Sequence, residues 1–335
     1  MRRDRTSKRA ERRGLYTNET YAQARPLLHP AWPPIPAAGC AEQRNFEADL
    51  FHEVLDAPAD FVVYPFGIRQ VRPFPDTIEL AVESEKRAGR LLSRILPSYE
   101  PDGEVHGMPG LRIRQRNGRG IEIHIVGRRT SVWLTGVPTG VWKRQEAAAL
   151  ENIVDIGWRP LWRGEQEWTD EEVLFEHRWN TGDWARHFQA GAWCSSGLLR
   201  RLAIFHTITP ADAVTGYKGS GINGYQGLGP VRWCLDVIHR SGVPYRQEAL
   251  VAALTDPEFG LPLAPARHLD AIYPPDQMQK RNWIRLDDRA RTGLVELRFE
   301  TFNYPSLQSG RCGPEYQGIA EGVERRIDRV LHNER

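Results

Sequence analysis

The sequence has few cysteines, few lysines and no long apolar run. Its 335 residues include four cysteines, and no two of them form a CxxC pair. This spacing argues against a zinc finger and against a disulfide framework. No stretch approaches the roughly 18–20 apolar residues that cross a bilayer, and no apolar signal core follows the basic start. We therefore expect a cytoplasmic protein without membrane attachment.

Charge is distributed unevenly along the chain. The formal net charge is +2, but residues 1–13 alone carry seven cations against two carboxylates, so the remainder is acidic. We interpret residues 1–20 as a flexible basic arm that contacts nucleic acid by counterion release. The alternative is a solubilising tail. The arm's predicted contact residues are Arg2, Arg3, Arg5, Lys8, Arg9, Arg12 and Arg13.

The order of patterns predicts an α+β protein. After the arm, residues 21–42 form a Pro-rich linker. Residues 43–150 form an antiparallel β-meander domain with flanking helices, and residues 151–335 form a mostly helical, Trp- and Gly-rich domain with a late β-hairpin. Helices are predicted near 43–55, 83–96, 143–151, 169–179, 183–192, 196–207, 230–240, 245–254 and 317–331. Strands are predicted at 68–72, 77–82 and 131–135, with a hairpin at 283–299.

The strongest local signal is a hairpin at 111–126. Two alternating runs flank Asn117-Gly118, a dipeptide typical of tight hairpin turns. Registers that set the isoleucines on one face place three arginines beside Glu122 and His124 on the other. That face is either a phosphate-binding surface or a lattice of structural ion pairs. The three arginines are Arg112, Arg114 and Arg116.

A glycine-rich loop at 216–230 precedes Pro230. Backbone amides at such a turn bind anions, although no Walker A motif is present. Tyr217–Asn223 resembles the YTGSGY…IN segment of ADP-ribosyltransferase toxins over about ten residues. The downstream Ser-Thr-Ser and Glu-x-Glu elements of that family are missing, so no catalytic residue follows from the resemblance. The predicted ligand-binding residues are Lys218, Gly219, Ser220, Gly221 and Asn223.

Eight of the eleven tryptophans fall within residues 133–193, where they form either core or a surface for a protein partner. Residues 172–187 also hold side chains of metal-ligand type, but they lack an HExxH pattern. We predict no metal site and no bound cofactor. The side chains of metal-ligand type are Glu172, Glu176, His177, Asp183 and His187.

The leading hypothesis is a non-enzymatic protein that associates with DNA or RNA. The alternative is an enzyme or binding protein that takes a phosphorylated small molecule or nucleotide at residues 216–230. A third hypothesis is an interaction protein with a tryptophan surface. The sequence does not decide whether the protein is an enzyme.

Overall fold

The computed structural model of the chain combines helices with mixed sheets, which confirms the predicted α+β class. It describes residues 5–29, 32–55, 64–163, 167–181, 183–208, 222–226, 232–240, 247–266, 283–288 and 293–302. The α-helices there are α1 (Arg5–Thr17), α2 (Tyr21–Ala24), α3 (Ala41–Leu55), α4 (Glu85–Ile95), α5 (Thr139–Asp155), α6 (Asp170–Asn180), α7 (Asp183–Leu199), α8 (Ile204–Thr207) and α9 (Gln247–Leu254).

The strands form three sheets. The first sheet contains β1 (Ile68–Pro73), β2 (Ile78–Val82), β5 (Leu111–Asn117), β6 (Gly120–Ile125) and β7 (Val132–Thr135). The second contains β9 (Ile222–Gln226), β10 (Arg232–Arg240), β11 (Ala264–Pro265), β12 (Trp283–Asp287) and β13 (Leu294–Phe302). A small third sheet contains β3 (Ser98–Tyr99), β4 (Val105–His106) and β8 (Arg159–Pro160).

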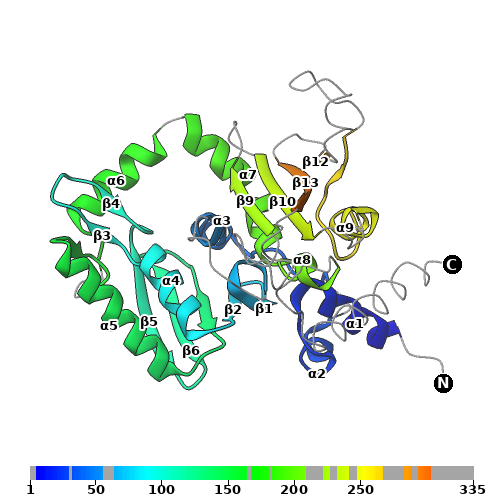
Figure 1. Ribbon diagram of the computed structural model, residues 1–335, viewed down its shortest axis with the longest axis horizontal. Helices are drawn as coiled ribbons and strands as arrows, with labels where there is room; N and C mark the ends of the chain where they lie inside the picture. Colours follow the sequence, from blue (N-terminus) through cyan, green and yellow to red (C-terminus); the bar gives the residue numbers. More distant parts are fainter. Residues whose placement is uncertain are drawn as a thin grey trace.

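The first sheet has the strand order β1-β2-β7-β6-β5, with helices α4 and α5 packed side by side next to it (Figure 1). Strands β5, β6 and β7 form the predicted antiparallel meander. Strands β2 and β7 run parallel, so the sheet is mixed rather than wholly antiparallel. A parallel pair needs a long crossover, and here α4 and the β5–β6 hairpin lie between the two strands in the chain.

The register of the β5–β6 hairpin sets the isoleucines on the core side, as predicted. Ile113 lies opposite Ile123, and Ile121, Ile123 and Ile125 are all buried. An irregularity at Arg114 then shifts the pairing by one residue, so Gln115 rather than Arg114 lies opposite Glu122. A bulge of this kind bends the strand and redirects a side chain.

The second sheet has the order β11-β12-β13-β10-β9 and contains the predicted late hairpin as β12 and β13. The predicted helix over residues 230–240 is wrong, because Arg232–Arg240 is strand β10, paired in parallel with β13. Trp233, Leu235 and Val237 alternate into the core, which is the two-residue period of a strand. Strand β9 likewise occupies part of the glycine-rich run, where we had expected irregular backbone.

Most predicted helices are present, with different ends. Helix α5 is longer than the predicted 143–151, and α7 continues to Leu199 where two helices were predicted. The predicted helix at 317–331 lies outside the described residues. Among the described residues, no helix combines the length and apolarity needed to cross a membrane.

The prediction of a flexible arm is wrong for residues 5–17, which form α1. Ala10, Leu15 and Tyr16 of this helix are buried. The Tyr16 hydroxyl donates to the carbonyl of Ala253 at 2.9 Å, and the backbone N–H of Ala203 donates to the carbonyl of Tyr16 at 3.2 Å. Although α1 is rich in charged residues, one side of this helix is apolar and packs against the second half of the chain.

Residues 21–42 are not a free linker either. They contain α2 and a 3-10 turn, Arg25–Leu27, and Ile35 belongs to the core. The carbonyls of Pro34 and Pro36 accept hydrogen bonds from the interior guanidinium groups of Arg13 and Arg200. Prolines leave these carbonyls free for such donors because they do not join a regular helix or sheet.

One hydrophobic cluster connects the two large sheets. It runs from Leu15 in α1 through Ile123 in the first sheet to Leu297 in the second, and α3 and α7 pack against each other near its centre (Figure 1). The predicted division into two domains at residue 150 stays a prediction.

Candidate functional site

Some of the predicted contact residues of the N-terminal segment are exposed, and others form ion pairs with residues elsewhere in the same chain. Arg9 Nε lies 2.7 Å from Glu258 Oε1, and Arg12 forms an ion pair with Asp256. Arg5 and Lys8 are exposed on α1. Arg2 and Arg3 lie outside the described residues. Arg9 and Arg12 thus help to hold the segment on the body, while Arg5 and Lys8 are exposed to water.

Arg13 is an interior residue, with 1% of its surface exposed. Its Nε donates to Glu19 at 2.6 Å, and its terminal nitrogens donate to the carbonyls of Pro34 and Pro73. Buried charges persist in proteins when they are paired and hydrogen-bonded in this way. Arg13 therefore holds α1 in place and is not available for phosphate contact.

Arg112 is also withdrawn from water. Its terminal nitrogens donate to Glu172 at 3.0 and 2.8 Å, and both side chains are at most 2% exposed. Glu172 additionally completes a capping box with Thr169 at the start of α6. It also accepts from the backbone N–H of Gly110 at 2.8 Å. This arginine fits the structural ion-pair interpretation of the hairpin.

Arg114 and Arg116 remain at the surface. Their side chains are 45% and 34% exposed. Arg114 pairs with Glu122 at 2.9 Å, and Arg116 pairs with Glu146 of α5 at 2.5 Å. Because the bulge shifts the register, Arg116 lies opposite Ile121 on the isoleucine face, and the prediction that it lies beside Glu122 is wrong.

The surface around these two arginines is rich in positive charge, and we call it the basic ridge. Arg114 pairs with Glu122, whereas Arg116 lies opposite Ile121 and pairs with Glu146, so these two ion pairs form on opposite faces of the hairpin. Arg163 lies 3.9 Å from Glu146, and Lys143 precedes Glu146 by one turn of α5. The hairpin turn reaches the start of α5, because Thr139 donates to the carbonyl of Asn117. The ridge consists of Arg114, Arg116, Arg119, Lys143 and Arg163, all exposed.

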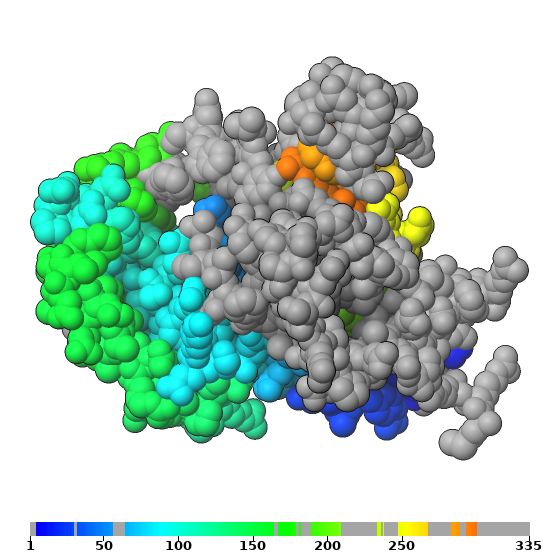
Figure 2. All heavy atoms as spheres, in the orientation of Figure 1, coloured from blue at the N-terminus to red at the C-terminus, as the bar shows by residue number. Residues whose placement is uncertain are grey.

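Helix α5 and the first sheet, in cyan and green, form the outer left side of the molecule in Figure 2. The sequence analysis missed Arg119, Lys143 and Arg163. Only long-range contact places the latter two beside the hairpin. Arg119, in contrast, belongs to the predicted turn and could have been included.

The partly exposed arginines of the hairpin differ from the buried Arg112 in how readily they can bind an anion. The guanidinium groups of Arg114 and Arg116 are 45% and 34% exposed and can reach an anion in solution, although their partners Glu122 and Glu146 are only 6% and 9% exposed. Breaking a buried pair such as Arg112–Glu172 costs about 3–5 kcal/mol, because it leaves an uncompensated charge. The ridge, and not the buried arginines, is therefore the part of the hairpin that can bind an anion.

A hydrogen-bond network fixes the base of the ridge to the interior. Glu122 accepts from the hydroxyl of Ser131 at 2.8 Å, and Ser131 exchanges backbone hydrogen bonds with the amide of Gln43. Gln43 donates to Glu47 at 2.8 Å, and Glu47 forms a fully buried pair with Arg200 of α7. This network connects the hairpin to α3 and α7, so the backbone carrying the ridge is well anchored.

His124 lies on the same face as Glu122 and is 8% exposed. Burial lowers the pKa of its imidazole, and the nearby Arg114 lowers it further. Nδ1 lies 3.3 Å from the carbonyl of Ile125, which accepts only, so Nδ1 carries the proton. No described group hydrogen-bonds to Nε2. The result is a neutral imidazole with a basic lone pair on Nε2.

The predicted ligand loop can be followed at one position only. Asn223 is in β9, opposite Asp236 of β10. Lys218, Gly219, Ser220 and Gly221 lie outside the described residues. The phosphorylated-ligand hypothesis therefore stays a prediction.

The tryptophan-rich region is largely core. Trp142 and Trp162 are buried, and three further indoles pack against the hydrophobic cluster: Trp158, Trp168 and Trp193. Trp168 also donates from Nε1 to the carbonyl of Val126 at 3.0 Å. These five side chains stabilise the fold, in keeping with the core interpretation. A protein partner at this region stays a prediction.

The acidic and histidine residues of segment 172–187 are used structurally where they are described. Glu172 pairs with Arg112, and Glu176 pairs with Arg128 at 2.5 Å. His177 is exposed on α6. Two of these carboxylates are thus neutralised by arginine.

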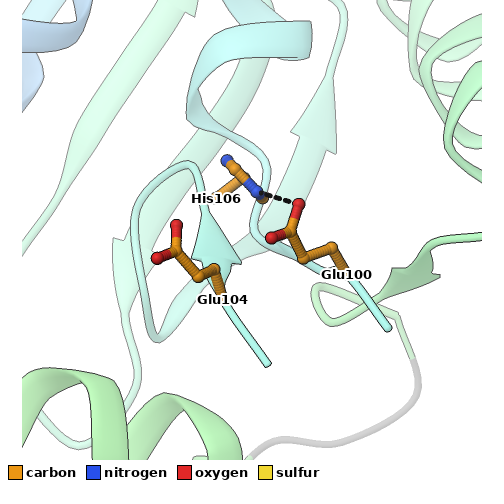
Figure 3. A group of neighbouring side chains, drawn as sticks. All are labelled: Glu100, Glu104 and His106. Atoms are coloured by element: carbon orange, nitrogen blue, oxygen red, sulfur yellow. Dashed lines mark hydrogen bonds and ion pairs between the residues drawn. The ribbon is translucent and has the colours of Figure 1, made fainter. Parts of the chain in front are cut away.

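A different cluster of metal-ligand type lies on the hairpin formed by β3 and β4. One ligand atom from each of Glu100, Glu104 and His106 lies within 4.8 Å of the others (Figure 3). His106 Nε2 is 2.9 Å from Glu100 Oε2. The sequence analysis missed this group, although the Pro-Asp-Gly turn at 101–103 is a hairpin signal that would have brought the three residues together.

Comparison of the chain with protein-family models, with curated proteins and with solved structures found no match.

Proposed function

We propose that this protein binds nucleic acid, with the basic ridge as the surface that contacts phosphates. The observation behind this proposal is the set of exposed cations on the β5–β6 hairpin, on α5 and just after β8, namely Arg114, Arg116, Arg119, Lys143 and Arg163. Guanidinium groups suit phosphate because their fixed N–H forks match its oxygens.

The ridge replaces the N-terminal segment as the leading contact. Of that segment's described cations, Arg9, Arg12 and Arg13 hold α1 on the body, which leaves Arg5 and Lys8 at the surface. We assign those two a secondary role. Binding of this kind is independent of sequence, because phosphate contacts position a protein without reading bases.

A cytoplasmic location is part of the same proposal. The described cysteines Cys40, Cys194 and Cys234 are all free thiols, and Cys40 is exposed. Free surface thiols are typical of reducing compartments.

The test is fluorescence anisotropy with short labelled DNA and RNA, single- and double-stranded, at rising salt. The ridge variant combines Arg119→Gln, Lys143→Gln and Arg163→Gln, which spares the shorter ion pairs of the ridge. Each lost phosphate contact lowers the slope of log K against log salt by about 0.9 for duplex DNA and about 0.7 for single strands. If all three side chains contact phosphates, we expect the ridge variant to lose about 2.7 units of slope on duplex DNA and about 2.1 on single strands.

Two controls accompany the ridge variant. Arg5→Gln with Lys8→Gln measures the N-terminal contribution, and Arg25→Gln with Arg178→Gln removes exposed cations elsewhere. The second control should leave the slope unchanged. Wild-type protein without salt-dependent binding, or a ridge variant with the wild-type slope, would overturn the proposal.

A further inference from the structure

The β3–β4 hairpin forms a compact loop rich in acidic side chains. The backbone N–H of Glu100 donates to the carbonyl of Glu104, and that of Gly103 donates to the carbonyl of Glu100, both at 3.0 Å. Gly103 has φ of +98°, a conformation that favours glycine. This tight turn brings two carboxylates next to the imidazole of His106 (Figure 3).

The imidazole is held in a defined orientation by a tryptophan. The ring of His106 stacks on that of Trp158, with centroids 4.3 Å apart and planes inclined by 12°. Trp158 follows α5, and its backbone N–H donates to the carbonyl of Ile153 at 2.9 Å. Stacking fixes the ring plane, so that Nε2 points at Glu100 while the side chain stays 41% exposed. An oriented, accessible imidazole of this kind is suited to ligate an ion.

The second carboxylate is left without a counterion. Among the described residues, none contacts the Glu104 carboxylate through a hydrogen bond or ion pair. The neighbouring Arg159 stacks on the Tyr99 ring and pairs with Glu171 at 2.6 Å, so its charge is directed elsewhere. The hydrogen bond between His106 and Glu100 explains why two of the three side chains lie together, whereas a bound cation would explain the position of all three.

The distances suit a first-row divalent ion. Zinc binds imidazole nitrogen at about 2.0–2.1 Å and carboxylate oxygen at about 2.0–2.2 Å, which sets ligand atoms about 3.4 Å apart in a tetrahedron. His106 Nε2 and Glu100 Oε2, at 2.9 Å, need to separate slightly, and the exposed Glu104 side chain can rotate toward them. A mixed nitrogen and oxygen set favours zinc over the oxygen-seeking magnesium and calcium.

We propose that Glu100, Glu104 and His106 form a surface site for a divalent transition-metal ion, with Zn²⁺ as the expected occupant. Three protein ligands leave a coordination position for water or for a ligand from outside the protein, as in open zinc sites. The site is independent of the basic ridge, so either can be absent without the other.

The test is competition for Zn²⁺ between the full-length reduced protein and a chromophoric chelator. All variants carry Cys40→Ser, which removes an exposed thiol that would bind zinc by itself. The ligand variants are His106→Gln and Glu104→Gln, and the control is His177→Gln, which removes an exposed histidine on α6. Glu104→Gln is the sharper variant, because the carboxylate makes no described contact on which folding depends.

We expect one Zn²⁺ per chain. Affinity should fall at least about tenfold in each ligand variant and stay unchanged in the control. X-ray absorption of the zinc complex should report one nitrogen ligand among oxygens. Absence of a stoichiometric site, or equal affinity in the parent and in Glu104→Gln, would overturn the proposal.

Discussion

Arg112 and Glu172 lie sixty positions apart in the chain and form a two-pronged ion pair that excludes water. The pair joins the edge strand β5 to the first turn of α6. Because Glu172 also caps that helix, one carboxylate fixes both the helix start and its place on the sheet.

The first prediction compares Arg112 with its neighbour Arg114. Arg112→Met should lower the free energy of unfolding by about 3–5 kcal/mol, because Glu172 is left charged and buried. Arg114→Met should lower it less, since the Arg114 side chain is 45% exposed and Glu122 keeps its hydrogen bonds from Gln115 and Ser131. Urea unfolding followed by circular dichroism measures both. Adding Glu172→Gln to Arg112→Met should restore part of the loss, and equal effects of the two single changes would contradict this account.

The second prediction concerns α1. Deletion of residues 1–17 should expose the apolar surface that Leu15 and Tyr16 cover, with raised binding of a hydrophobic dye and loss of a sharp unfolding transition. Tyr16→Phe, a milder change, removes the hydrogen bond to Ala253 and should cost about 0.5–1.5 kcal/mol. A deletion that leaves the melting curve unchanged would show that the segment is dispensable for the fold.

The third prediction concerns pH. The pKa of His124 is lowered in the folded protein by burial and by Arg114, while the unfolded value is about 6.5. The unfolded chain therefore binds the proton more readily, so this group contributes full stability above about pH 6.5 and loses it as pH falls toward the folded value. His124→Gln should flatten the fall in unfolding free energy between pH 7 and pH 5. An NMR titration that gives His124 a pKa at or above about 6.5 would refute the assignment.

The fourth prediction concerns the thiols. Cys40 is exposed, whereas burial, together with the charge of Asp288, raises the pKa of Cys194 to about 12. Only the thiolate reacts with alkylating reagents, so Cys40 should be modified rapidly in the native protein and Cys194 only after unfolding. Peptide mapping by mass spectrometry after timed iodoacetamide treatment measures both rates. Similar rates at the two sites would argue against the packing around α7.

Local signals in the sequence predicted the first sheet well. The Asn117-Gly118 turn and the alternation of Ile121, Ile123 and Ile125 act over a few residues, so their structural consequence is visible in the sequence. The helix predicted near 169–179 is also present as α6, and it begins with a local capping box of Thr169 and Glu172. The bulge at Arg114 was missed, because alternation alone does not place an extra residue.

Competing signals and long-range contacts account for the errors. Pro230 suggested the first turn of a helix, while the alternation of Trp233, Leu235 and Val237 favoured the strand that forms. The basic ridge depends on Glu146 and Arg163, which approach the hairpin only after α5 packs. The charge of the first residues suggested disorder, but partners more than two hundred positions away order them.

The hydrogen bond from Tyr16 to Ala253 joins residues that are 237 positions apart, so it can form only after residue 253 has been synthesised. At about 5–20 residues per second, the ribosome adds the intervening chain in roughly 12–50 s. During that interval α1 has been synthesised, but the residues around Ala253 that it packs against have not. The apolar side of α1 is therefore still incompletely covered.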